Sequence, residues 1–187
     1  MFFSVSKNGI RSSASERIDI KFTKMSQKNK NRPNTEDMDK FAQELQEQIM
    51  EQIRKRYSET VINHWQNPRN FKKIKSPDGY ASVKGSCGDT MEMFIKMDRE
   101  KISECGFQTD GCGTTIVCGS VVTELALNKS FTEALARVSA DEILKILGGL
   151  PPADIHCAEL AAETLRRALA DYLYQKQSPW KKHYRSS

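Results

Sequence analysis

Residues 90–109 read TMEMFIKMDREKISECGFQT and carry the pattern that decides the fold of this chain. Every second residue in the first part of this stretch is apolar, which is typical of a strand with one buried face; these residues are Met91, Met93, Ile95 and Met97. Residues 98–100 can turn the chain, and a second strand follows over residues 102–107, with a bulge predicted at Gly106. Together with a strand around residues 80–83, this predicts a three-stranded antiparallel sheet.

Helical patterns flank the predicted sheet on both sides. Residues 35–56 carry apolar side chains at intervals of four, and this stripe either winds over the core or breaks near Ser58, which would cap a second helix. Pro68 ends that second helix, because the residue before a proline avoids helical geometry. After Pro151-Pro152, leucines at i, i+4 spacing predict a long amphipathic helix. The fold class is therefore α+β: a small three-stranded antiparallel sheet packed against several helices, with an extra N-terminal helix.

The chain is expected to have four parts. Residues 1–34 are predicted to be a disordered basic extension, with a presequence or a misplaced start as its two explanations. Residues 35–56 form the additional helix, 57–174 the main domain, and 175–187 a flexible basic tail. Of the formal net charge of +5, the first 32 residues contribute +6, so the remainder carries −1. A nearly neutral body argues against nucleic-acid binding.

Two further observations bear on where the chain works. No stretch approaches the about 18 consecutive apolar residues that span a bilayer, so no membrane segment is expected. The five cysteines are odd in number and irregularly spaced, unlike a secreted disulfide framework. We therefore expect a reducing compartment: the cytoplasm, or the mitochondrial matrix if the N-terminal segment is a presequence.

Three cysteines stand beside turn signals, and two of them have a further ligand-type residue next to them. Cys87 is followed by Asp89, Cys112 lies between two glycines before a predicted helix, and His156-Cys157 opens another helix. A thiolate near a helix N-terminus is stabilised by the helix dipole. Three thiolates with one carboxylate or imidazole suit either tetrahedral zinc or the iron of an iron–sulfur cluster. Spacing alone leaves open that each cysteine is a small buried hydrophobe and Asp89 a turn residue.

The other two cysteines are predicted to belong to the core. Cys105 lies in the second strand beside Phe107. Cys118 follows Cys112 by six residues, which on a helix places the two thiols on different faces.

Four segments of the chain resemble the NifU/IscU family of iron–sulfur cluster assembly scaffolds. The resemblance covers about residues 57–174, with the motifs in order and at near-constant spacing. The segments are YSETVINHWQNPRN (57–70), GSCGDTMEMFIKM (85–97), FQTDGCGTTI (107–116) and LPPADIHCAELAAETLRRALADY (150–172). The family fold is a three-stranded antiparallel sheet with helices packed over it, as the sequence patterns also predict.

The resemblance implies a role for each of the five candidate site residues. Cys87, Cys112 and Cys157 match the cysteines that hold a nascent [2Fe-2S] cluster. Asp89 matches an aspartate that completes the ligand shell and is associated with cluster lability, and His156 matches an alternative ligand. Cys157 also resembles the cysteine that accepts persulfide sulfur from a cysteine desulfurase. For that reaction we expect an exposed thiol with a lowered pKa, as a helix start offers.

The implied function is a non-enzymatic scaffold that builds a [2Fe-2S] cluster from Fe²⁺ and desulfurase-derived sulfur and passes it to apo-proteins. The implied partners are the desulfurase, an iron or electron donor such as a frataxin-like protein or a ferredoxin, the recipients, and a second copy in a homodimer. Asp154 stands where many members carry a lysine, so dependence on the specialised chaperone pair is doubtful. The alternative function is a zinc-binding sulfur acceptor of the SufU type, with Zn²⁺ on the same ligands.

Overall fold

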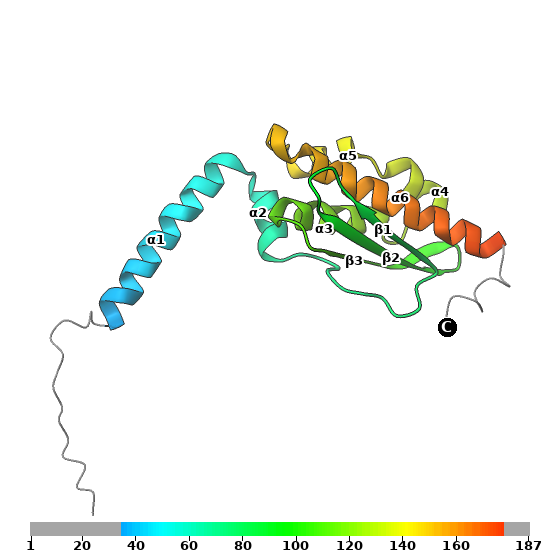
Figure 1. Ribbon diagram of the computed structural model, residues 1–187, viewed down its shortest axis with the longest axis horizontal. Coiled ribbons are helices and arrows are strands. Elements are labelled where there is room, and N and C mark those ends of the chain that lie inside the picture. Colours follow the sequence, from blue (N-terminus) through cyan, green and yellow to red (C-terminus); the bar gives the residue numbers. More distant parts are fainter. Residues whose placement is uncertain (1–34, 178–187) are drawn as a thin grey trace, which may run out of the picture. The chain divides into compact units, whose positions relative to one another are not determined.

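The computed structural model describes residues 35–177, and their sheet has three antiparallel strands in the order β1-β2-β3 (Figure 1). The strands are β1 (Gly79–Lys84), β2 (Thr90–Asp98) and β3 (Lys101–Thr109). A tight turn at Arg99 and Glu100, both with positive φ, joins the last two. The predicted sheet and the turn that pairs its two long strands are therefore confirmed.

The alternation in β2 marks the face that packs on the core. Met91, Met93 and Ile95 have no exposed surface. The predicted bulge at Gly106 is wrong, because Gly106 pairs regularly with Phe94 and the register shifts instead between Lys96 and Met97. A glycine is needed at position 106 for another reason: a Cβ there would lie 2.5 Å from the Lys72 carbonyl oxygen. A glycine within a strand signals close backbone approach as well as a bulge.

The helices lie before and after the sheet in the chain, as predicted. They are α1 (Thr35–Arg56), α2 (Glu59–Gln66), α3 (Gly113–Ala126), α4 (Phe131–Arg137), α5 (Ala140–Leu147), a 3₁₀ turn η1 (Pro152–Asp154) and α6 (Ile155–Gln177). The apolar stripe breaks where Ser58 caps α2, accepting a hydrogen bond from the Val61 N–H at 3.2 Å. No helix within residues 35–177 is long and apolar enough to cross a membrane.

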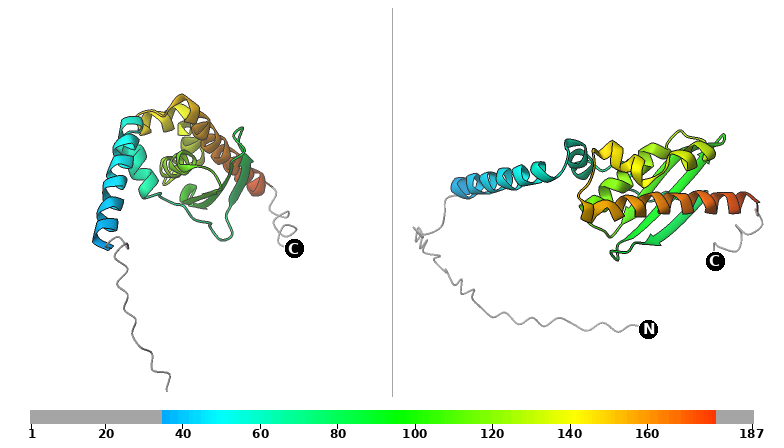
Figure 2. Two further views of the ribbon diagram at one scale, coloured as in Figure 1. Left: turned by 60° about the vertical axis from the view of Figure 1, so that its left-hand side comes forward. Right: turned by 90° about the horizontal axis from the view of Figure 1, so that it is seen from above.

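The core lies between the sheet and two long helices. α6 runs along β1 and β2, while α3 packs on β3 and on α6 (Figures 1 and 2). Leu165 and Leu169 of α6 are fully buried, and Cys105 and Cys118 are at most 1% exposed. The prediction that these two cysteines belong to the core is confirmed. This packing fixes the first turns of α3 and α6, which carry three of the candidate site residues.

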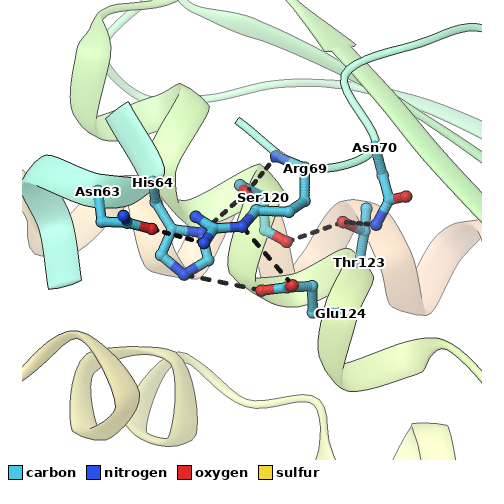
Figure 3. A network of polar contacts seen from close by, with 7 residues as sticks. All are labelled: Asn63, His64, Arg69, Asn70, Ser120, Thr123 and Glu124. Atoms are coloured by element: carbon cyan, nitrogen blue, oxygen red, sulfur yellow. Dashed lines mark hydrogen bonds and ion pairs between the residues drawn. The ribbon is translucent and has the colours of Figure 1, made fainter. Parts of the chain in front are cut away.

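A buried polar network fastens α2 and the segment after it to α3 (Figure 3). The Ser120 hydroxyl lies 2.8 Å from His64 Nδ1 and accepts a hydrogen bond of 2.8 Å from the Arg69 backbone N–H. Glu124 lies 3.7 Å from His64 Nε2 and 3.8 Å from Arg69 Nε. Asn70 donates to the Thr123 hydroxyl at 3.1 Å. The NHWQNPRN segment thus has a structural task in this chain.

Candidate functional site

The first part of the candidate site is the turn between β1 and β2. The Gly85 N–H donates to the Asp89 carbonyl at 2.8 Å, and Gly88 adopts a positive φ of 93°. Cys87 is exposed at this turn. Its thiol is close enough to Asp89 to help lower the pKa of that carboxyl group. The turn therefore presents one thiol and one carboxylate together.

The second part is the N-terminus of α3, where Cys112 is the N-cap residue and its thiol is exposed. Asp89 reaches across from the turn: its carboxylate accepts hydrogen bonds from the Thr115 hydroxyl at 2.8 Å and from the Cys112 N–H at 3.3 Å. Gly111 permits this approach, because a Cβ at position 111 would collide with the Asp89 carboxylate and lie 2.9 Å from Thr115 Cβ. The glycine before Cys112 is therefore part of the site.

The third part is the start of α6, which brings His156 and Cys157 to the same place. The Cys157 Sγ atom lies 3.5 Å from His156 Nε2. It also lies 3.4 Å from the Thr115 hydroxyl and 3.6 Å from the Thr114 hydroxyl. The Cys112 Sγ atom contacts the same two hydroxyls at 3.5 and 2.9 Å. Thr114 and Thr115 thus link the Cys112 and Cys157 thiols.

Sequence reasoning missed these two threonines. The pair Thr114-Thr115 follows a candidate ligand directly at a predicted helix start, and this is the signal that could have found it. Hydroxyls in the first turn of a helix commonly stay local, so the pattern by itself does not predict contact with a cysteine 42 residues further along the chain.

The three thiols do not share one environment. Burial raises the pKa of Cys112, but hydrogen bonds from Thr114 and Thr115 outweigh that effect and leave the pKa lowered. The Thr115 hydrogen bond lowers the pKa of Asp89 despite partial burial. Cys157 is fully buried, and burial raises its pKa more than the threonine hydroxyls lower it.

The expectation of an exposed Cys157 with a lowered pKa is therefore wrong. The expectation fails because the side of α6 that carries Cys157 faces the core. The exposed thiol with a lowered pKa is Cys112. The two core cysteines differ from both, since burial raises the pKa of Cys105 to about 12 and also raises that of Cys118.

The fold brings together Asp89, Cys112, His156 and Cys157, with Cys87 at the adjoining turn. Within residues 35–177, however, no three of the ligand-type side chains are already arranged to hold a metal ion. The thiols of Cys112 and Cys157 contact the hydroxyls of Thr114 and Thr115 instead. A metal or cluster would therefore have to displace those contacts and draw in the exposed Cys87.

Residues 56–179 match the family model described as the NifU-like N terminal domain. The chain belongs to this family. An iron–sulfur cluster assembly scaffold protein from Archaeoglobus fulgidus is 44% identical over 117 residues, covering 62% of this chain and 76% of the relative. The corresponding scaffold protein of Escherichia coli is 39% identical over 127 residues, or 65% and 98% of the two chains.

A solved structure supports the same fold for this NifU-like chain. It is that of a putative iron–sulfur cluster assembly scaffold protein for the SUF system from Fervidobacterium islandicum. Its TM-score is 0.51 at 22% identity, over 60% of this chain and 96% of that one. This likeness concerns the arrangement of the sheet and helices.

The NifU-like domain also has a cavity of about 300 Å³ beside Cys112. It lies between the end of α1, α2 and the start of α3, and Tyr57, Trp65 and Val117 are among its mostly apolar lining. The Tyr57 hydroxyl donates to the Asp154 carboxylate at 3.0 Å. Asp154 is thus already paired within the chain.

Proposed function

We propose that this chain is an iron–sulfur cluster assembly scaffold that holds a nascent [2Fe-2S] cluster and releases it to apo-proteins. One observation carries the proposal: three segments far apart in the sequence bring the candidate ligands together around Thr115. Thr115 itself lies 2.8 Å from Asp89, 3.5 Å from the Cys112 thiol and 3.4 Å from the Cys157 thiol. A structural role for these polar groups would not require two cysteines and a carboxylate around one hydroxyl.

The donor set suits a cluster that must leave again. Cys87, Cys112 and Cys157 supply the soft thiolates that iron–sulfur clusters require. The fourth ligand is Asp89 or His156, and a carboxylate is a harder donor that holds sulfide-bridged iron less tightly than a thiolate. The N-termini of α3 and α6 both meet the site, and their dipoles favour an anionic cargo.

Sulfur reaches the scaffold from the persulfide of a cysteine desulfurase. A scaffold thiolate attacks the terminal sulfur, the S–S bond of the donor persulfide breaks, and the desulfurase thiolate leaves. Family resemblance assigns the acceptor role to Cys157, but that thiol is buried, whereas Cys87 and Cys112 are exposed. Of these two, Cys112 shares the Thr114 and Thr115 hydroxyls with Cys157. We assign the first encounter to Cys112, with passage to Cys157 by a second exchange of the same kind.

The remaining partners follow from the same task. A frataxin-like protein supplies the iron, or a ferredoxin supplies the electrons, that cluster assembly requires. The Tyr57–Asp154 hydrogen bond supports independence from the specialised chaperone pair, because the position that carries a lysine in many members has the opposite charge here and is already paired.

Anaerobic reconstitution with iron, cysteine and a desulfurase tests the proposal. The loaded chain should show sulfide-to-iron charge-transfer absorption in the visible range. Cys87→Ala, Cys112→Ala and Cys157→Ala should each lose most of it. Cys105→Ala is the matched control, since it removes a buried thiol outside the site and should retain the spectrum. Retention of the spectrum in all three site variants would rule out this site.

The same donors also fit tetrahedral zinc, which keeps the sulfur-acceptor function as a second candidate. Three thiolates with one carboxylate or imidazole make a complete structural zinc shell. Metal and labile-sulfide analysis of protein purified from iron-replete cells separates the two. Stoichiometric zinc without sulfide, together with faster desulfurase turnover, would favour the zinc-bound sulfur acceptor.

A further inference from the structure

Helix α1 carries large apolar side chains that the described part of the chain leaves uncovered. Phe41, Leu45 and Ile49 are 62%, 47% and 51% exposed. They recur every four residues and, with the half-buried Ile53, form one continuous ridge along the helix. A helix face of this kind is normally buried against another surface. The family match begins at residue 56, so this face lies outside the residues that the family model covers.

The charges along α1 indicate what covers the ridge. Between Phe41 and Arg56, all three acidic residues precede all three basic ones; they are Glu44, Glu47 and Glu51, then Arg54, Lys55 and Arg56. In an antiparallel pair centred on Ile49, Glu44 of one copy lies level with the basic end of the other, while Glu47 and Glu51 lie on the side of the helix away from the ridge. A parallel pair sets like charges side by side. Because acids flank most of the ridge, an anionic membrane surface does not suit it.

We propose that α1 is a self-association element that pairs antiparallel with α1 of a second copy of this chain. Ridges of i, i+4 side chains interdigitate when two helices cross at about −50°. Centring the pair on Ile49 sets Ile49 against its own counterpart and Leu45 against Ile53. The ridge is then complementary to itself, as a two-fold interface requires.

One charge pair fixes the direction of pairing. Glu44 and Lys55 are about three helical turns apart at ~3.6 residues per turn, so they lie on the same side of the ridge. In the antiparallel pair, Glu44 of one copy faces Lys55 of the other at both ends. Lys55 has an exposed partner of its own at present, Glu51 at 3.0 Å. Exposed pairs of this kind contribute little, so Lys55 remains available to the second copy.

Sedimentation equilibrium of the full chain tests the proposal. It is run metal-free with chelator and reductant, so that neither a bridging cluster nor a disulfide through the exposed cysteines can join two chains. With increasing concentration, the wild-type mass should rise from 21.3 kDa toward twice that value. Leu45→Glu should remain monomeric at concentrations where the wild type is mostly dimer. Gln43→Glu introduces the same residue on the opposite side of the helix and should dimerise normally.

Charge reversal tests the direction. Glu44→Lys and Lys55→Glu should each weaken the dimer several-fold, and the double variant should restore it, because the facing pair is then merely exchanged. In a parallel pair, residue 44 lies level with residue 44 of the other copy, and residue 55 with residue 55. A single charge reversal then exchanges one pair of like charges for another and should not weaken the dimer. A wild-type chain that stays monomeric, or a Leu45→Glu variant that dimerises as the wild type does, would overturn the proposal. Cluster reconstitution on the monomeric variant is a separate readout, so failure of the dimer leaves the scaffold proposal intact.

Discussion

Replacing Gly111 with alanine is the sharpest test of how Asp89 is held in the site. The new Cβ would collide with the Asp89 carboxylate and lie 2.9 Å from Thr115 Cβ, so the carboxylate has to move out. It then loses the hydrogen bonds from the Thr115 hydroxyl at 2.8 Å and the Cys112 N–H at 3.3 Å. Hydrogen bonds to a charged group contribute ~1.5–3 kcal/mol each. Because Asp89 is partly exposed and water replaces part of this, we expect a total loss of about 2 kcal/mol.

The assay is urea unfolding of the metal-free chain, completed as a double-mutant cycle. Gly111→Ala is measured in the wild-type background and again in Asp89→Ala, where the carboxylate is absent. The destabilisation should be clearly smaller in the second background, because only the contact with Thr115 remains. An equal loss in both backgrounds, or no loss in the wild type, would refute the conclusion that Gly111 makes room for Asp89.

Three further predictions follow from the buried network and the thiols. Ser120→Ala should lower the free energy of unfolding by roughly 2–4 kcal/mol in urea melts, because it leaves the buried His64 Nδ1 and the partly buried Arg69 N–H without their partner; an unchanged midpoint would contradict this. Burial, aided by Arg69, lowers the pKa of His64 below its unfolded value, against the opposing charge of Glu124. Its stabilising contribution is therefore complete above pH ~6.5 and is lost as the pH falls toward the folded pKa. The slope of stability against pH between 8 and 5 should be shallower in His64→Gln, and an equal slope would count against it. In the metal-free chain, iodoacetamide should label Cys112 well before Cys157, as followed by peptide mass spectrometry, and equal rates would be inconsistent with the burial of Cys157.

The sheet and the long helices were predictable because their patterns depend on local periodicity. The alternation of Met91, Met93 and Ile95 predicts β2 directly, and the leucine spacing predicts α6. The bulge could not be placed in the same way. Gly106 satisfies a close approach by the Lys72 carbonyl, and nothing in the strand sequence separates that from a bulge.

The proximity of the candidate residues was predictable, but their electrostatics were not. A helix start predicts a stabilised thiolate, and Cys112 fits that expectation. Cys157 has the same local signal, but the side of α6 that faces the core decides its burial, and this depends on tertiary packing. The contribution of Thr115 depends likewise on contacts to Asp89 and Cys157, which lie 26 and 42 residues away in the chain.

Transfer of the cluster from the loaded chain to an apo-ferredoxin tests the central claim most directly. The wild-type chain, loaded anaerobically with iron and sulfide quantified, should convert the apo-ferredoxin to its cluster-bound form. Asp89→Ala should carry the same cluster and release it several-fold more slowly, because His156 then completes the ligand shell with a nitrogen donor that holds iron more tightly than the carboxylate does. A wild-type chain that binds the cluster but never delivers it, or an Asp89→Ala variant that delivers it faster, would contradict the account.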